Sequence, residues 1–196
     1  MKKFILFLFI IFTSVAFSYQ PPSDKARGVF FAIGVGPRVP MFDFATRSML
    51  GYGISIEISY TDNEYLPFFL YGKIGFEQFP GSQELYQSSD YSHFSANMLP
   101  LQAGARYYFP PILENIVIVI PFIESSASFT VIQNLHEFKQ GTLKSNFLED
   151  KNKFGFSIGA GVSMFLMEIV GNYNFIEDNH YLSMDIKVRL PLFVSL

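Results

Sequence analysis

The stretch MDIKVRLPLFVSL at residues 184–196 alternates between apolar and polar positions up to the last residue. Its apolar members are Met184, Ile186, Val188, Leu190, Leu192, Val194 and Leu196. The positions between them carry three charges, at Asp185, Lys187 and Arg189. Successive side chains of a β-strand point to opposite faces, so this period of two predicts a strand with one apolar and one polar face.

The same period of two recurs along the whole chain and, with the terminal stretch, predicts eight strands. The other strands are expected at residues 29–35, 52–60, 68–77, 99–109, 116–131, 154–164 and 167–175. Long connections are expected at residues 37–48, 80–94 and 132–152, with a shorter one at 176–180. The connections at residues 61–66, 110–115 and near Phe165 are short. An even number of strands joined by alternating long and short connections is typical of an antiparallel up-and-down barrel.

The two faces of these strands differ in a way that indicates what each face meets. The polar set consists mostly of Gly, Ser and Ala with about one charge per strand, which suits the narrow interior of an eight-stranded barrel. A water-exposed face would carry many Lys and Glu residues. Aromatic residues gather near strand ends, as in the girdles of membrane barrels, at Tyr52, Tyr60, Phe68, Phe76, Tyr107, Phe109, Phe154, Tyr173 and Phe175. We therefore predict an all-β, eight-stranded antiparallel transmembrane barrel; a soluble lipocalin-like barrel would reverse the two faces.

The N-terminus has the features of a secretory signal peptide. Lys2 and Lys3 precede an apolar run from Phe4 to Phe12, and the small Ser18 marks the expected cleavage site. A membrane-anchoring helix would need about 20 apolar residues, but polar residues begin soon after this run. The sequence thus predicts a signal peptide at residues 1–18, a periplasmic segment at 19–27 and a barrel at 28–196.

Composition excludes several classes of function. The chain has no Cys, which excludes a disulfide framework, thiol catalysis and a lipid-anchored N-terminal Cys. It has 14 Lys and Arg against 17 Asp and Glu with no basic patch, so nucleic acid is not an expected partner. The three histidines, His93, His136 and His180, lack the spacing of metal ligands. We expect neither a metal nor a cofactor.

Four segments resemble those of small outer-membrane β-barrel proteins of the OmpA/OmpX type. They are LPLQAGARYYF (99–109), FGFSIGAGVSMF (154–165), GNYNF (171–175) and the terminal strand, and the resemblance spans about residues 28–196. It implies a multi-pass barrel in the outer membrane of a diderm bacterium, in contact with outer-membrane lipid and lipopolysaccharide and inserted by the barrel assembly machinery. The chain departs from the family in ending with Leu196, where family members usually carry an aromatic residue.

A set of charged residues is expected to face the barrel interior. Its members are Glu57, Lys73, Glu77, Arg106, Glu124, Glu168, Asp185, Lys187 and Arg189. Acids and bases confined to so narrow a space are expected to form ion pairs and plug the lumen. The alternative is a narrow ion path between them.

The tetrapeptide SHFS at residues 92–95 places His93 and Ser95 at the rim of the fourth strand. It is similar to the His-x-Ser of outer-membrane lipid A deacylases, in which Ser attacks an ester with His as the base. No acidic partner is evident apart from Asp90, and two residues do not make a triad. We therefore expect a protein that is not an enzyme, with a rim-sited lipid-modifying activity as an alternative.

The long connections carry exposed aromatic residues among polar neighbours, which suits recognition of an extracellular ligand. The candidates are Tyr86, Tyr91, Phe94, Phe138 and Phe147. Alternatively, these rings pack on one another and cap the barrel mouth. The expected function is surface binding, adhesion or envelope integrity through the connections; a narrow channel and a soluble carrier remain as alternatives.

Overall fold

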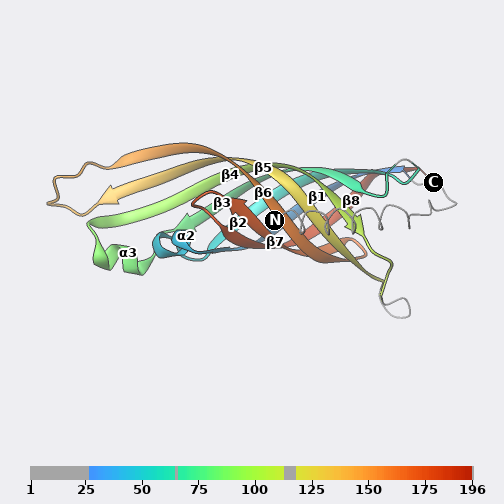
Figure 1. Cartoon of the computed structure of the whole chain (residues 1–196), viewed down its shortest axis with the longest axis horizontal. Coiled ribbons are helices and arrows are strands. Elements are labelled where there is room, and N and C mark those ends of the chain that lie inside the picture. Colours follow the sequence, from blue (N-terminus) through green and yellow to red (C-terminus); the bar gives the residue numbers. More distant parts are fainter. Residues whose placement is uncertain (1–26, 65, 113–117, 196) are drawn as a thin grey trace, which may run out of the picture.

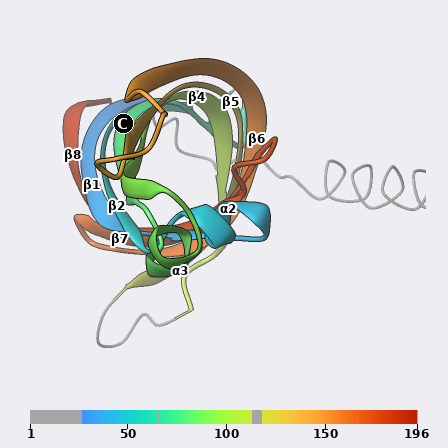
Figure 2. The same cartoon turned by 90° about the vertical axis from the view of Figure 1, so that its left-hand side faces the viewer.

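Eight antiparallel strands close into one barrel in the order β1 to β8 (Figures 1 and 2). The computed structural model describes residues 27–64, 66–112 and 118–195, so the predicted signal peptide and nearly all of the segment 19–27 lie outside the described residues. The elements are β1 (Arg27–Pro40), α2 (Asp43–Arg47), β2 (Gly51–Asp62), β3 (Phe69–Pro80), α3 (Gln83–Ser88), β4 (Tyr91–Tyr108), β5 (Val119–Phe138), β6 (Phe147–Met164), β7 (Met167–Ile176) and β8 (Tyr181–Ser195). Within the described ranges, neither helix has the length and apolar character needed to cross a bilayer.

The strands turn their apolar face outward and their polar face into the barrel. In β2, Ile56 is 47% exposed on the outside, while the neighbouring Glu57 is 1% exposed inside. The same alternation continues in β8, where Ile186 is exposed and Lys187 is buried. An apolar exterior around a polar interior is the arrangement of a membrane barrel, because only lipid makes such a surface favourable. The predicted fold class is confirmed, and the faces are not those of a soluble barrel.

Aromatic girdles bound the apolar exterior at two levels. Phe68, Tyr107 and Phe109 lie at the end that carries the short connections, with ring centroids 5.9 Å and 5.1 Å apart along this series. At the opposite end Tyr173 and Phe175 pack with their centroids 4.3 Å apart. We call these the turn end and the projecting end. Long connections lie on the extracellular side of outer-membrane barrels.

Introducing a charge midway between the two girdles tests the orientation of the faces. Ile56 lies between Tyr52 and Tyr60 on the outer face of β2. The substitution Ile56→Arg is expected to lower the free energy of unfolding by about 2–4 kcal/mol, the cost of a charge at the bilayer midplane. Urea unfolding in lipid vesicles, followed by the mobility of unboiled protein on a gel, measures it. The matched control is Leu143→Arg in the exposed β5–β6 connection, and equal stability of the two variants would contradict lipid contact at Ile56.

Three strands continue well beyond the barrel at its projecting end, which corrects the predicted connections. Residues 91–94 and most of residues 132–152 are strand, because β4, β5 and β6 keep pairing as far as Tyr91↔Phe138 and His136↔Phe147 (Figure 1). We call residues 91–95, 132–138 and 147–152 the projecting sheet. These residues lack a clean period of two because neither face of the sheet meets lipid, so selection for one apolar face is absent.

β1 is also longer than predicted, since it continues through Arg38 to Pro40 where a connection was expected. At the other end, β8 contains a bulge. Phe30 pairs with Pro191 and the next residue of β1, Val29, pairs with Phe193, so Leu192 between them has no opposite residue in β1. The prediction of an unbroken alternation to the last residue is therefore wrong at this point, and Leu196 lies outside the described residues.

Candidate functional site

The half of the lumen nearer the turn end holds a cluster of ion pairs around Arg106, whose side chain is 0% exposed. Its guanidinium nitrogens lie 3.0 Å from Glu57, 2.6 Å from Glu124 and 3.2 Å from Glu168. Lys187 Nζ lies 2.7 Å from Glu57, and Arg189 contacts Glu57 at 3.3 Å and Glu168 at 2.9 Å. We call Glu57, Arg106, Glu124, Glu168, Lys187 and Arg189 the central ion cluster. The ion pair Arg106–Glu124 joins residues that lie directly opposite each other on β4 and β5, and Glu168 lies opposite Lys187 on β7 and β8.

A second ion-paired group lies nearer the projecting end. Arg38 Nε is 2.7 Å from Glu77, and its Nη2 is 2.9 Å from Asp185. Arg38 is absent from the predicted luminal set because a connection was predicted at its position, although Val35, Pro37 and Val39 continue the alternation of β1. Arg38 balances the charge of the predicted luminal set, in which the acids outnumber the bases by one. Gly53 leaves room for it, since a Cβ there would lie 2.8 Å from the guanidinium.

Lys73 differs from the other predicted luminal charges. It is buried and faces Glu57 and Gln102 across the neighbouring strands. In the described part of the chain it makes no ion pair within 4.0 Å. All nine predicted residues point into the lumen. Lys73 is stabilised there by the electrostatic field of its neighbours rather than by a direct ion pair.

Aromatic and aliphatic side chains close the lumen on both sides of the charges. Towards the turn end, Tyr108 packs on Phe69 and Phe122 with centroids 4.8 Å and 5.2 Å away. Towards the projecting end, a buried cluster consists of Phe44, Phe79, Phe94, Ala96, Met98, Ile132, Ile176 and Tyr181, which we call the apolar plug. Phe44 lies on α2, and its ring centroid is 4.7 Å from that of Phe79. This plug was not predicted from the sequence, because a single aromatic residue in a connection carries no periodic signal.

The predicted binding aromatics divide into two groups. Phe94 belongs to the apolar plug and is buried, and Tyr86 on α3 packs against that plug and bonds through its hydroxyl to Phe94. The other three lie on strands of the projecting sheet and form a row of rings: Tyr91 stacks on Phe138 at 4.8 Å, and Phe138 on Phe147 at 6.2 Å. They were expected in connections, and their position on paired strands makes the row rigid.

His136 extends this row and was not among the predicted binding residues. Its ring lies parallel to that of Phe147 at 4.4 Å, and its Nδ1 is 2.9 Å from the Tyr91 hydroxyl. Burial lowers the pKa of His136, which favours the neutral imidazole. Nearby, a hydrogen bond from Lys151 lowers the pKa of the Glu149 carboxyl. The row is therefore an aromatic surface bordered by an ion pair.

The residues proposed for rim catalysis are not assembled. The Ser95 hydroxyl is buried and has no hydrogen-bond partner, so His93 does not activate it. Asp90 is 2.9 Å from Lys144, and this hydrogen bond lowers the pKa of its carboxyl. A Ser–His–Asp site needs each member bonded to the next, and these described residues lack that chain of contacts.

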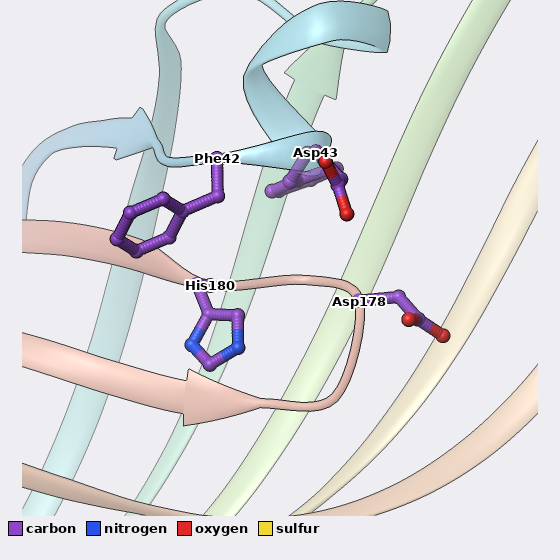
Figure 3. Close-up of a pocket in the computed structure, with 5 residues that line it drawn as sticks. Phe42, Asp43, Asp178 and His180 are labelled. Carbon is purple, nitrogen blue, oxygen red and sulfur yellow. The ribbon is translucent and has the colours of Figure 1, made fainter.

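A cavity of about 180 Å³ lies between α2 and the β7–β8 connection (Figure 3). Phe42, Asp43, Phe44, Asp178 and His180 line it. The carboxylate of Asp178 points away from His180 and lies 2.9 Å from Lys153 (Figure 3). Among the residues that the structure describes, no group of His, Cys, Asp or Glu could hold a metal ion. The cavity thus lacks converging ligands.

Comparison with known proteins gives the fold but no family assignment from sequence. No protein-family model matches the chain, and no curated protein sequence matches it either. Among solved structures, Neisserial surface protein A is 13% identical with a TM-score of 0.55, covering 85% of this chain and 99% of its own. Ail, the attachment invasion locus protein of Yersinia pestis, is 12% identical (TM-score 0.47), and the N-terminal β-barrel domain of Pseudomonas aeruginosa OprF is 13% identical (TM-score 0.45). They cover 85% and 84% of this chain and 99% of their own. The likeness to Neisserial surface protein A, at a TM-score of 0.55, agrees with the closed barrel of eight strands, so the fold of this chain is that of the small eight-stranded outer-membrane β-barrel proteins.

Proposed function

We propose that the chain is an integral outer-membrane protein, exported by its signal peptide, that binds an extracellular partner through the projecting sheet without catalysing a reaction. The observation that carries this proposal is the continued pairing of β4, β5 and β6 beyond the barrel, with an ordered row of aromatic rings on one face. The barrel serves as the anchor that holds this sheet outside the membrane.

The interior supports a role as an anchor rather than as a channel. The central ion cluster joins three acids to Arg106 within 3.2 Å, and the apolar plug lies between these charges and the projecting end. An ion crossing the lumen would have to separate buried ion pairs, which is costly in a low-dielectric interior. Together with the buried plug, this supports a lumen that does not conduct.

The projecting sheet has the properties of a preformed binding surface. Phe147 is 48% exposed and Leu148 is 59% exposed, whereas Tyr91, His136 and Phe138 are partly buried and hold the row in place. At the outer end of β5, Lys139 ties the sheet to the β3–β4 connection by donating from Nζ to the carbonyls of Tyr86 and Ser89, at 2.8 Å and 2.7 Å. Rigid aromatic side chains with polar neighbours bind partners at a low entropic cost.

Removing two rings of the row is expected to abolish binding without unfolding the barrel. Cells that display the wild-type chain are expected to be retained on at least one surface of a panel coated with collagen, mucin or cellulose. The variant F138S/F147S is expected to lose about fivefold or more of this retention, since a few buried aromatic anchors dominate most interfaces. The matched control is Phe165→Ser at the turn end, where the exposed Phe165 has φ 55°. Equal retention of cells with and without the chain would contradict the proposal.

A further inference from the structure

The projecting sheet has one free edge, on β6. β6 pairs with β5 from Met164 up to Phe147, but with β7 only from Met164 to Gly155. β7 ends at Ile176, where the chain turns towards β8. Among the described residues, 147–154 therefore have a strand partner on one side only. β5 and β6 reach furthest from the barrel at this end (Figure 1).

The turn between β6 and β7 fixes which backbone groups face the free side. Met164 pairs with Met167 across the two-residue turn of Phe165 and Leu166. In a two-residue hairpin the residues flanking the turn exchange N–H and C=O hydrogen bonds. Every second residue of β6 therefore directs its backbone groups towards the β7 side. Beyond the end of β7 this series continues as Phe154, Asn152, Asp150 and Leu148.

The β7–β8 connection covers the end of the free edge that lies nearer the barrel. Lys153 Nζ donates to the Glu177 carbonyl at 2.6 Å and to the Asp178 carboxylate at 2.9 Å, so this connection lies against β6 at Lys153. The accessible edge is thus residues 147–152, about 20 Å long at roughly 3.3 Å per residue. Its other side pairs with β5 in an unbroken register, so the edge is already extended.

We propose that residues 147–152 bind an extended peptide segment of a partner protein, which adds to β6 as an antiparallel strand. This inference rests on the proposed function and names the class of partner. An unpaired strand edge offers main-chain hydrogen bonds to any strand, and the side chains select among them. Leu148, Asp150 and Asn152 are exposed beside the free groups.

Charge complementarity specifies the partner segment. Directly opposed cross-strand pairs are stabilised by opposite charges and destabilised by like charges. The segment is therefore expected to place a basic residue opposite Asp150, an acidic residue opposite Lys151 and an apolar residue opposite Leu148. A second copy in the same membrane does not fit, because an axis along the membrane normal relates the copies and their β6 strands run in the same sense.

The probe is the fluorescein-labelled hexapeptide Thr-Glu-Lys-Thr-Val-Tyr, whose Lys, Glu and Val meet those three positions when it runs antiparallel to β6. Fluorescence anisotropy measures its binding to the full chain folded in detergent micelles. D150P removes the free N–H of Asp150 and leaves the β5 ladder intact, whereas D150A keeps the N–H. Both variants lose the 3.1 Å hydrogen bond that Asp150 accepts from Gln133. D150P is expected to bind the peptide about tenfold more weakly than D150A. The proline removes one main-chain hydrogen bond to the peptide, and its ring obstructs the neighbouring one.

Amide exchange on the wild-type chain gives a second measurement that needs no variant. The peptide is expected to slow exchange at Leu148, Asp150 and Asn152 and to leave Glu149 and Lys151 unchanged, since these two already belong to the β5 ladder. Equal affinity of D150P and D150A, or no saturable binding, would overturn the inference. If F138S/F147S still abolishes cell retention in that case, the proposed function stands and only the edge assignment falls.

Discussion

Replacing Arg106 with Met is expected to lower the free energy of unfolding by about 3–5 kcal/mol, the cost of breaking a buried ion pair by removing one partner. Arg106 is the shared partner of Glu57, Glu124 and Glu168, all within 3.2 Å of its guanidinium. Without it these carboxylates face one another in a closed lumen, where Lys187, Arg189 and the more distant Lys73 offset them only in part. Urea unfolding in detergent, followed by the gel mobility of unboiled protein, measures the change.

Two further substitutions separate the cluster from a general effect of losing a charge. Arg27→Met is the matched control, because Arg27 is more than half exposed and contacts Asp62 at 2.8 Å. An exposed pair of this kind contributes about 1 kcal/mol or less. Arg106→Lys is expected to fall between wild type and Arg106→Met, since a compact ammonium group keeps the charge but cannot reproduce the planar fork of donors that the guanidinium presents to the three carboxylates. A loss below about 1 kcal/mol for Arg106→Met would show that the three acids tolerate each other, contrary to the cost expected for a buried charge.

The alternation of side chains predicts the fold only where the two faces of a strand meet different environments. β2 has lipid on one side and the lumen on the other, and its predicted face assignment matches the observed exposure of Ile56 and burial of Glu57. The projecting sheet has no such contrast, so residues 132–138 and 147–152 carry little period-two signal and were read as a connection. Arg38 was also assigned to a connection. Its neighbours do alternate, but Pro37 and Pro40 flank this part of the chain.

The candidate site was predictable in its members but not in its contacts. Alternation places Glu57 and Lys187 in the lumen, yet their 2.7 Å pair joins residues 130 positions apart and depends on closure of the barrel. The aromatic row needs the extended register that pairs His136 with Phe147, and no local spacing encodes it. The free edge of β6 follows from a difference in length between β6 and β7, which the sequence shows only once both strand ends are known.

Replacing Phe79 with Ala is expected to lower the free energy of unfolding by about 3–5 kcal/mol, the usual cost of emptying a buried aromatic site. Phe79 is fully buried in the apolar plug, with Phe44 at 4.7 Å and Tyr181 at 5.4 Å. The matched control is Phe42→Ala beside α2, where the exposed ring is expected to contribute about 0.5 kcal/mol or less. The same urea titration measures both variants, and equal stability of the two would show that the plug does not stabilise the barrel.

The Phe79 variant also separates the two layers that close the lumen. In planar bilayers the wild-type chain is expected to be silent, and Phe79→Ala is expected to remain silent as well. The reason is that beneath the plug Arg38 still pairs with Glu77 and Asp185, at 2.7 Å and 2.9 Å, and the central ion cluster still fills the lumen below these pairs. Conductance in Phe79→Ala alone would identify the plug as the only barrier. Conductance in the wild type would instead turn the luminal charges into an ion path and move the function from the projecting sheet to the interior.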